Sequence, residues 1–300
     1  MNNFHPLTTF KDEIVFELLS DFFEQNCNLA DVQPGLGSNL ITYVWQNKNA
    51  PSDQYQQLRI ETLALLKEVI KSCQTKSKEA NTLHLISLKN ENVVVDIGAN
   101  KLAALNYFGA RFPSIEKLIA VDIVPQQKNF QFPEKSQYIQ VSPNEKEIPI
   151  ESGTVDVVHI QFVLHHLESQ QKIHDMLHEA YRILRPKGRL LIWEESFTSN
   201  YDASFLQAAQ SAGIMTDQKL TTRFYALSDQ QKWSFITTLD WIINVGNPHM
   251  PWTGQYYDWK TWCQIIEQAG FSKQREINLG LRLNGKLKQG VHMFGEFERG

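Results

Sequence analysis

Five short, largely apolar runs alternate with helical patterns along the middle of the chain. They are VVVDIG at 93–98, LIAVDI at 118–123, QYIQVS at 137–142, VDVVHI at 155–160 and RLLIWEE at 189–195. A continuous apolar run that stops at a glycine, as the first one does, is typical of a strand buried on both faces of a parallel sheet. Strands that alternate with helices predict right-handed βαβ units and an open α/β sheet.

Helical patterns flank this series on both sides. Upstream, apolar residues recur every three or four positions from Ile14 to Phe23 and from Tyr55 to Cys73. A polar stretch follows at 74–81, and we expect it to be a mobile loop. Downstream, residues 200–262 begin with helical sequence and contain five of the seven tryptophans.

These patterns predict how the chain is organised. We expect a helical N-terminal extension over 1–92 and a Rossmann-like domain over 93–300. Two strands at 274–283 and 291–299 flank the glycine-containing segment NGKLKQG, which predicts an antiparallel hairpin at the sheet edge. Residues 200–262 are expected to be a helical, aromatic-rich insert, and the insert and the extension are expected to form a cap together.

Composition narrows the classes of function. The 300 residues are 42% hydrophobic and carry a net charge of −4, with no block of Lys and Arg, so a nucleic-acid partner is not expected. The three cysteines are far apart and form no CxxC pair, which argues against a disulfide framework or a metal site. There is no signal-peptide pattern and no stretch of eighteen apolar residues, so we expect a soluble, cytoplasmic protein without a membrane partner.

The first two strands end in residues that suit a nucleotide cofactor. Open α/β sheets bind ligands at the carboxyl ends of their strands. The first strand ends in Asp96-Ile97-Gly98-Ala99-Asn100, whose small residues let the backbone approach a ligand closely. The second ends with Asp122, whose carboxylate can accept both hydroxyls of a ribose. A turn glycine and a surface aspartate are the alternative interpretation of the same residues.

Three later motifs, in order along the chain, resemble one enzyme family. They are IPIESGTVDVVHIQFVLHHLES at 148–169, HEAYRILRPKGRLLIWEE at 178–195 and QAGF at 268–271. Together they resemble class I S-adenosylmethionine-dependent methyltransferases of the small-molecule, ubiquinone-biosynthesis type. The resemblance is strong over 93–195 and loose over 262–300.

The resemblance implies a Rossmann-like sheet of seven strands, the last of them antiparallel, with S-adenosylmethionine across the ends of strands one to four. Asp122 would bind the ribose, the residues after the third strand would contact adenine, and those after the fourth would lie beside the methionine part. Carried over by position, the cofactor-binding residues are Asp96, Gly98, Ala99, Asn100, Asp122, Ser142, Pro143, Gln161 and Phe162.

The chain departs from the family at two places in this expected site. The family's first loop has the pattern D-x-G-x-G-x-G, and here Asn100 and Leu102 replace the second and third glycines. Asn adopts a positive φ at modest cost, whereas Leu102 is expected to push the following helix outward or to fill part of the cofactor site. Ser142 stands where the family usually has the aspartate that contacts adenine.

Candidate groups for the chemistry follow the fourth and fifth strands. Methyl transfer depends mainly on positioning, and a general base helps when the acceptor is a hydroxyl. The catalytic candidates are His165, His166 and Glu194. The histidines are alternatively interpreted as caps for the next helix, and the glutamate as a partner for backbone donors.

Aromatic residues of the extension and the insert are the candidate substrate contacts. An aromatic-lined pocket suits a flat hydrophobic or cationic molecule, although most of these rings are expected to pack in a core. The residues proposed to contact substrate are Tyr43, Trp45, Trp233, Trp241 and Tyr256.

Three hypotheses about function follow. The first is methyl transfer from S-adenosylmethionine to an O or N atom of a small molecule. The second keeps the fold with a relict or repurposed cofactor site, in a binding or regulatory protein or in an enzyme such as a cyclase. The third, a nicotinamide-dependent oxidoreductase, fits Asp122 but lacks the GxGxxG loop that such enzymes carry after the first strand.

Overall fold

A computed structural model gives the fold of the chain. It describes residues 6–25, 33–72, 85–88, 91–100, 102–126, 132–143, 145, 147–199, 202–211, 213–247, 252, 254–284 and 287–300. The loop expected at 74–81 lies outside these residues. The chain forms two compact units. Unit 1 comprises 1–80, 195–256 and 278–292, and unit 2 comprises 81–194, 257–277 and 293–300.

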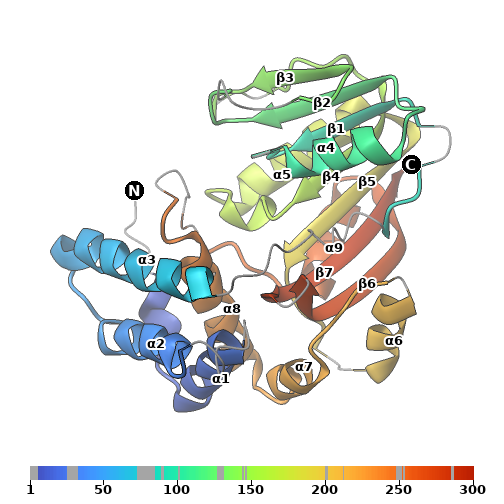
Figure 1. Cartoon of the computed structure of the whole chain (residues 1–300). Coiled ribbons are helices and arrows are strands. Elements are labelled where there is room, and N and C mark those ends of the chain that lie inside the picture. Colours follow the sequence, from blue (N-terminus) through green and yellow to red (C-terminus); the bar gives the residue numbers. More distant parts are fainter. Residues whose placement is uncertain are drawn as a thin grey trace. The chain divides into compact units, whose positions relative to one another are not determined.

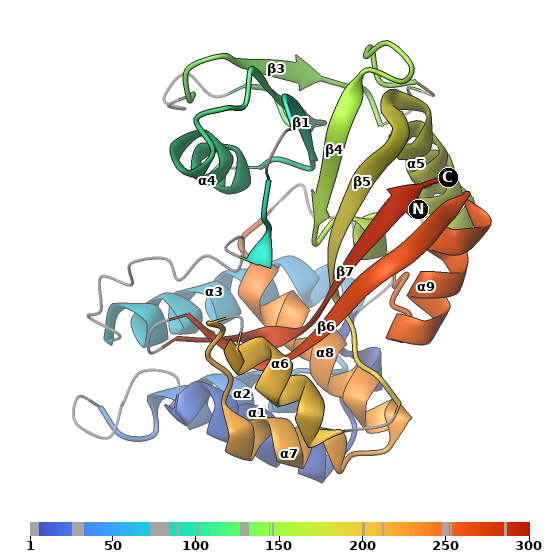
Figure 2. The ribbon, with the colours of Figure 1, turned by 90° about the vertical axis from the view of Figure 1, so that its right-hand side faces the viewer.

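Seven strands form one sheet in the order β3-β2-β1-β4-β5-β7-β6. The first five pair in parallel, and β7 runs antiparallel between β5 and β6. The predicted class I methyltransferase type of sheet is therefore confirmed (Figure 2). Its strands are β1 (Val93–Ile97), β2 (Lys117–Asp122), β3 (Ser136–Gln140), β4 (Val155–Gln161), β5 (Leu184–Glu195), β6 (Phe271–Asn284) and β7 (Leu287–Arg299).

The strand boundaries differ most from the predicted ones in β5 and in the hairpin. β5 begins at Leu184, and its residues 185–188 bulge out of the pairing with β4, where Val155 faces Leu184 but Val157 faces Arg189. In that bulge Lys187, rather than a glycine, has the positive φ of 61°. The hairpin is also tighter than expected, because NGKLKQG contributes to both strands and leaves only 285–286, outside the described residues, between them.

Five of the α-helices begin at a side-chain cap. Asp12, Ser169, Asp217, Ser228 and Asp258 each accept backbone N–H groups at a helix start, which satisfies donors that the helix itself cannot. The helices are α1 (Glu13–Glu24), α2 (Leu36–Gln46), α3 (Tyr55–Ser72), α4 (Ala103–Arg111), α5 (Gln170–Ile183), α6 (Ala203–Ser211), α7 (Gln218–Tyr225), α8 (Asp229–Asn244) and α9 (Trp259–Gln268). The sequence pattern did not identify α2.

In unit 2 the strands are covered by helices on both faces (Figure 2). α5 and α9 pack on one face, where Val158, Ile160, Leu190 and Ile192 alternate inward along β4 and β5. α4 covers the opposite face, toward which Phe108 points. Burial on both faces explains why the strands read as almost continuous apolar runs.

In unit 1 the helices of the N-terminal extension and of the insert share one hydrophobic core (Figure 1). Phe22 on α1 packs edge-on against Phe235 on α8, with ring centroids 6.0 Å apart. Leu40, Leu58 and Leu220 from three further helices belong to the same cluster. Two segments separated by more than 100 residues therefore depend on each other for burial. No helix in the described part of the chain is long and apolar enough to cross a membrane.

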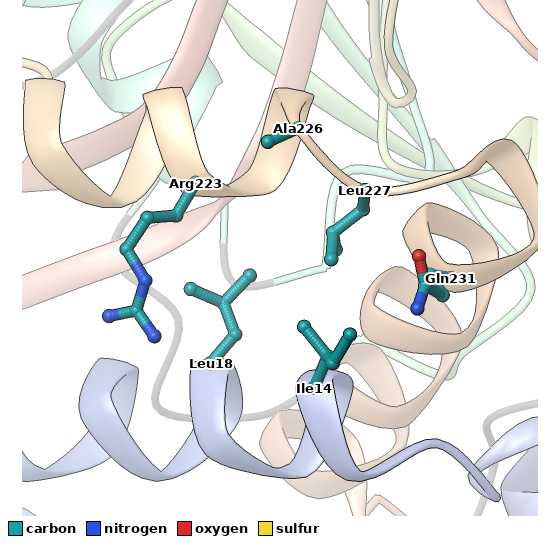
Figure 3. Close-up of a pocket in the computed structure, with 6 residues that line it drawn as sticks. All are labelled: Ile14, Leu18, Arg223, Ala226, Leu227 and Gln231. Carbon is teal, nitrogen blue, oxygen red and sulfur yellow. The ribbon is translucent and has the colours of Figure 1, made fainter.

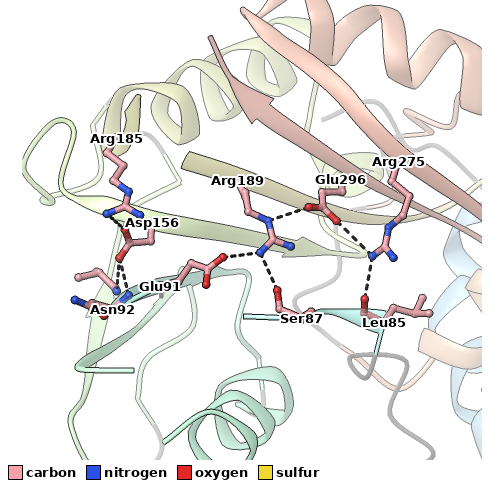
Figure 4. A network of polar contacts seen from close by, with 10 residues as sticks. Leu85, Ser87, Glu91, Asn92, Asp156, Arg185, Arg189, Arg275 and Glu296 are labelled. Carbon is pink, nitrogen blue, oxygen red and sulfur yellow. Dashed lines mark hydrogen bonds and ion pairs between the residues drawn. The ribbon is translucent and has the colours of Figure 1, made fainter. Parts of the chain in front are cut away.

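A buried carboxylate secures the start of β1 in unit 2 (Figure 4). Asp156, on β4, accepts the backbone N–H groups of Asn92 and Val93, each at 2.7 Å. Its other oxygen pairs with Arg185 at 2.6 Å. The Asp156 side chain is 4% exposed and that of Arg185 is 51% exposed. The hydrogen bonds from the backbone to Asp156 are therefore more shielded from water than its ion pair with Arg185.

A second group of charges links β5 and β7 to the segment before β1 (Figure 4). Arg189 donates to Glu91 at 2.6 Å and to Glu296 at 2.9 Å, and also to the backbone oxygen of Ser87. Arg275 pairs with the other oxygen of Glu296 at 3.3 Å. These bonds tie strands that are distant in sequence at the end of the sheet where β1 begins.

We expect Asp156→Ala to lower the free energy of unfolding by about 2–4 kcal/mol, because two buried N–H groups lose their acceptor. Arg185→Ala is the matched control and should cost about 1 kcal/mol or less, since its side chain is half-exposed. Urea denaturation measures both. Equal losses in the two variants would show that the ion pair, and not the backbone bonds, is what matters.

Candidate functional site

The loop after β1 has a positive φ, typical of glycine, at three positions, although only one of the three is a glycine. Gly98, Asn100 and Leu102 have φ angles of 74°, 39° and 63°. These are the three positions at which the D-x-G-x-G-x-G pattern places glycine. A leucine in the left-handed region costs roughly 1–2 kcal/mol, so the surrounding structure must impose this shape.

Backbone hydrogen bonds hold this loop against β2. The N–H of Gly98 donates to Val121 O at 2.8 Å, and the N–H of Leu102 donates to Ala99 O at 2.7 Å. Leu102, at the start of α4, is 1% exposed. Its side chain is therefore part of the packed interior of the protein.

Asp122, at the end of β2, is the acceptor that joins the loop to the strand. One carboxylate oxygen accepts the N–H of Asn100 at 2.7 Å, and the other accepts the N–H of Val124 at 3.0 Å. Each oxygen keeps a further lone pair. On the neighbouring strand, burial and the Asp122 carboxylate raise the pKa of Tyr138 to about 12, so its hydroxyl stays a neutral donor to Val124 O.

The chain after β4 meets the loop after β1. Phe162 has a φ of 55°, and its N–H donates to Trp193 O at 2.9 Å. A Cβ atom placed on Gly98 would lie 2.3 Å from Cγ2 of Val163. Glycine is thus required at 98 by the close approach as well as by its φ angle.

The residues expected to contact adenine lie in the exposed segment after β3. The N–H of Ser142 donates to Glu145 at 2.7 Å. The carbonyl of Pro143 accepts from Lys172 on α5 at 3.2 Å. The strands β3, β2, β1 and β4 are neighbours in the sheet. This segment, Asp122, the first loop and Gln161 therefore all lie at the carboxyl ends of neighbouring strands in unit 2.

A carboxylate–imidazole pair lies beneath the first loop. Asp96 on β1 and His159 on β4 face each other in the register, and an Asp96 carboxylate oxygen lies 2.7 Å from Nδ1 of His159. Their side chains are 5% and 0% exposed. Sequence reasoning placed Asp96 at the cofactor but missed His159, although a histidine inside the apolar run VDVVHI was a usable signal.

Of the catalytic candidates, the structure pairs Glu194 with His165. Glu194 is fully buried at the end of β5 and accepts the N–H of Leu164 at 2.9 Å and Nδ1 of His165. The ring of the partly buried His166 lies beside that of His165, with centroids 3.9 Å apart. Both oxygens of Glu194 thus hold the turn that follows β4.

The five aromatic residues proposed to contact substrate all lie in unit 1. Trp233 packs against Phe197 and neighbours Tyr256, with ring centroids 4.6 and 6.4 Å away. Trp241 is fully buried, and its indole N–H donates to Tyr55 at 2.8 Å.

The other two aromatic candidates lie on α2. Trp45 contacts Phe10 edge-on at 4.8 Å. Tyr43 donates its hydroxyl to Glu61, and burial together with this bond raises its pKa to about 12. The structure therefore brings Trp233 and Tyr256 together, while Trp241 belongs to the core of unit 1.

Unit 1 also contains buried polar groups that sequence reasoning missed. The alternation of apolar residues around Asn278, on β6, does not indicate a role for this side chain. Its amide nevertheless donates to the hydroxyl of Tyr225 at 2.6 Å. His292 on β7 lies 3.8 Å from a carboxylate oxygen of Glu195. Lys232 is 3% exposed, pairs with Asp229 at 3.0 Å and lies 5.1 Å from the centre of the Phe197 ring.

A surface hollow of about 240 Å³ lies between α1, α7 and the start of α8 in unit 1 (Figure 3). Its lining is mainly apolar, with Arg223 and Gln231 at the rim. Arg223 is already paired with Asp21, and Gln231 donates to Asp12 at 2.9 Å. None of the site residues that the sequence suggests lines this hollow.

Comparison with known proteins identifies the middle of the chain. A family model described as "Methyltransferase domain" matches residues 95–192. The search of curated protein sequences found no match. The predicted resemblance to a methyltransferase is confirmed for this segment, which contains most of β1 and β5 and all of β2, β3, β4, α4 and α5.

Several solved structures are similar at low identity. An S-adenosylmethionine-dependent methyltransferase from Aquifex aeolicus is 16% identical, with 77% of this chain and 96% of that chain covered and a TM-score of 0.44. One from Mesorhizobium loti is 10% identical, with 71% and 94% covered and a TM-score of 0.46.

The 1,6-didemethyltoxoflavin-N1-methyltransferase of Burkholderia thailandensis, solved with 1,6-didemethyltoxoflavin and S-adenosylhomocysteine bound, is 13% identical. In that comparison 83% of this chain and 90% of that chain are covered, with a TM-score of 0.47. Since these scores are below 0.5, the fold assignment rests on the strand order and the family model.

We expect Asn100→Ala to lower the free energy of unfolding by about 1 kcal/mol, because alanine lacks asparagine's tolerance of a left-handed backbone. Asn100→Gly should stay within about 0.5 kcal/mol of the parent. The control is Asn106→Ala in α4, an exposed helical position where alanine is neutral or stabilising. Thermal or urea unfolding gives the three values, and a harmless Asn100→Ala would disprove the strain.

Proposed function

We propose that the chain binds S-adenosylmethionine and transfers its methyl group to an O or N atom of a small aromatic or hydrophobic molecule. The match of residues 95–192 to the methyltransferase-domain model supports this proposal. The cofactor site we propose lies at the carboxyl ends of β1 to β4 in unit 2. The bound cofactor would supply an activated methyl group on its sulfonium.

One observation carries this proposal. Gly98, Asn100 and Leu102 all keep a positive φ although two of them are not glycine. A backbone strained at this level persists where the surroundings fix it, and such strain is concentrated at ligand sites. The retention of this glycine-like shape at Asn100 and Leu102 therefore supports a ligand site at the loop.

The roles of the cofactor residues follow from their bonds. Asp122 keeps a lone pair on each oxygen after binding two backbone N–H groups, so it can accept the two hydroxyls of a ribose. We propose that Ser142 and Pro143 border the adenine. Gln161 and Phe162 would border the methionine part, and Gly98 and Ala99 would allow close approach to it.

The chain's own groups would mainly position the reactants. We propose that Glu194 is a positioning residue, since both its oxygens bond to the turn that carries His165. His165 and His166 are the proposed proton acceptors for a hydroxyl substrate. The proposed aromatic class of substrate is based on five aromatic side chains: Tyr43, Trp45, Trp233, Trp241 and Tyr256. Of these, we propose that Trp233 and Tyr256 contact the substrate.

Isothermal calorimetry on the full chain tests the proposal. We expect saturable binding of S-adenosylmethionine and S-adenosylhomocysteine in the micromolar range, and about tenfold or weaker binding in Asp122→Ala, because the ribose loses a charged acceptor. Asp175→Ala, an exposed carboxylate on α5, is the matched control.

Two results would contradict the proposal. Absence of heat with both ligands would indicate a relict or repurposed site. Binding of NAD in their place would indicate the oxidoreductase.

A further inference from the structure

The hollow in unit 1 lies between two helices that carry charges of opposite sign (Figure 3). Every charged residue of α1 is acidic, and every charged residue of α7 is basic. Arg223 on α7 pairs with Asp21 on α1 across the gap between the two helices. The hollow therefore has an acidic helix on one side and a basic helix on the other.

Each helix carries a second charge one turn away from this ion pair. Glu17 precedes Asp21 by four residues on α1, and Lys219 precedes Arg223 by four residues on α7. Residues four apart lie on the same face of a helix. Glu17 and Lys219 are exposed, and the side chains of Asp21 and Arg223 are 44% and 36% exposed. All four charged groups are therefore accessible to a partner.

The surface between these charges is apolar. Leu18 and Leu227 line the hollow and are 1% and 8% exposed, whereas Ile14 at its side is 56% exposed. A single exposed isoleucine is ordinary on a protein surface. Here it stands beside an apolar hollow of about 240 Å³ with charged groups around it. Exposed apolar surface with a polar rim is typical of a protein–protein contact.

The arrangement of charges selects the kind of partner. An acidic peptide, a nucleic acid or an anionic membrane would be attracted by α7 and repelled by α1. A partner that presents both signs in the opposite order is attracted by both helices. A second copy of this chain, related by a two-fold axis through the hollow, is such a partner, because the rotation places α1 of one copy opposite α7 of the other.

We propose that the α1/α7 surface, made of Ile14, Glu17 and Asp21 on α1 and of Lys219 and Arg223 on α7, binds a second copy of this chain. In the two-fold dimer Ile14 of each copy packs into the hollow of the other, and Glu17 of each copy faces Lys219 of the other. This inference is independent of the proposed methyl transfer.

The size of the surface sets the expected strength of the dimer. α1 has 12 residues and α7 has 8, so the helices are about 18 and 12 Å long. A contact made mainly by two such helices lies at the small end of specific protein interfaces. We therefore expect a dissociation constant on the order of 10 μM.

Sedimentation velocity on the full chain, between about 1 and 100 μM, measures this constant. We expect Ile14→Gln to weaken the dimer about tenfold, because a two-fold interface loses the apolar contact twice. The matched control is Ile60→Gln on α3, an isoleucine that is 54% exposed and does not line the hollow. It should stay within about twofold of the parent. Circular dichroism checks that both variants are folded.

Charge reversal tests the two-fold geometry itself. Glu17→Lys and Lys219→Glu should each weaken the dimer about tenfold when measured alone, because like charges then face each other across the interface. An equal mixture of the two variants should associate as tightly as the parent, since each helix again faces a helix of opposite charge. Contacts within one chain cannot produce this recovery.

Three outcomes overturn the inference: a parent that stays monomeric over the whole range, a dimer that neither Ile14→Gln nor the charge reversals weaken, or a mixture of the two charge variants that stays monomeric. A monomeric parent that binds phosphatidylcholine vesicles, with binding lost in Ile14→Gln, would assign the surface to lipid instead. Calorimetry with S-adenosylhomocysteine reports on the proposed function separately, so the two can fail independently.

Discussion

The bond from the Asn100 backbone N–H to the Asp122 carboxylate is the interaction on which the candidate site depends. It ties the loop after β1 to the end of β2. Together with the Gly98–Val121 and Leu102–Ala99 bonds, it holds the left-handed positions 98, 100 and 102. Two of these positions carry side chains that resist this conformation. The backbone shape of the loop is thus set by its surroundings more than by its own residues.

Two buried carboxylate–histidine pairs lie near the carboxyl ends of the parallel strands. Asp96 with His159 fixes the end of β1, and Glu194 with His165 fixes the turn after β4. The first pair joins the adjacent strands β1 and β4, and the second joins β5 to the turn after β4. Both pairs hold backbone near the carboxyl ends of β1 and β4 in place.

Unit 1 is stabilised by apolar contacts between two segments that are distant in the sequence. The extension and the insert bury their apolar faces in one core, so neither segment is expected to fold without the other. Of the aromatic residues singled out from the sequence, Trp241 is core, while Trp233 and Tyr256 lie together beside Phe197. Spacing along a helix cannot separate these two roles, because both give the same pattern of large rings.

The sequence by itself determined the five parallel strands between 93 and 195, since each is a local apolar run bounded by turn residues. It also placed Asp96, Gly98 and Asp122 at the ends of the first two strands, because the apolar pattern shows where a strand ends. Only the tertiary structure decided that Leu102 keeps a left-handed backbone, that Glu194 faces inward and that His159 is the partner of Asp96. Those facts depend on the register between strands from distant segments, and no local pattern encodes that register.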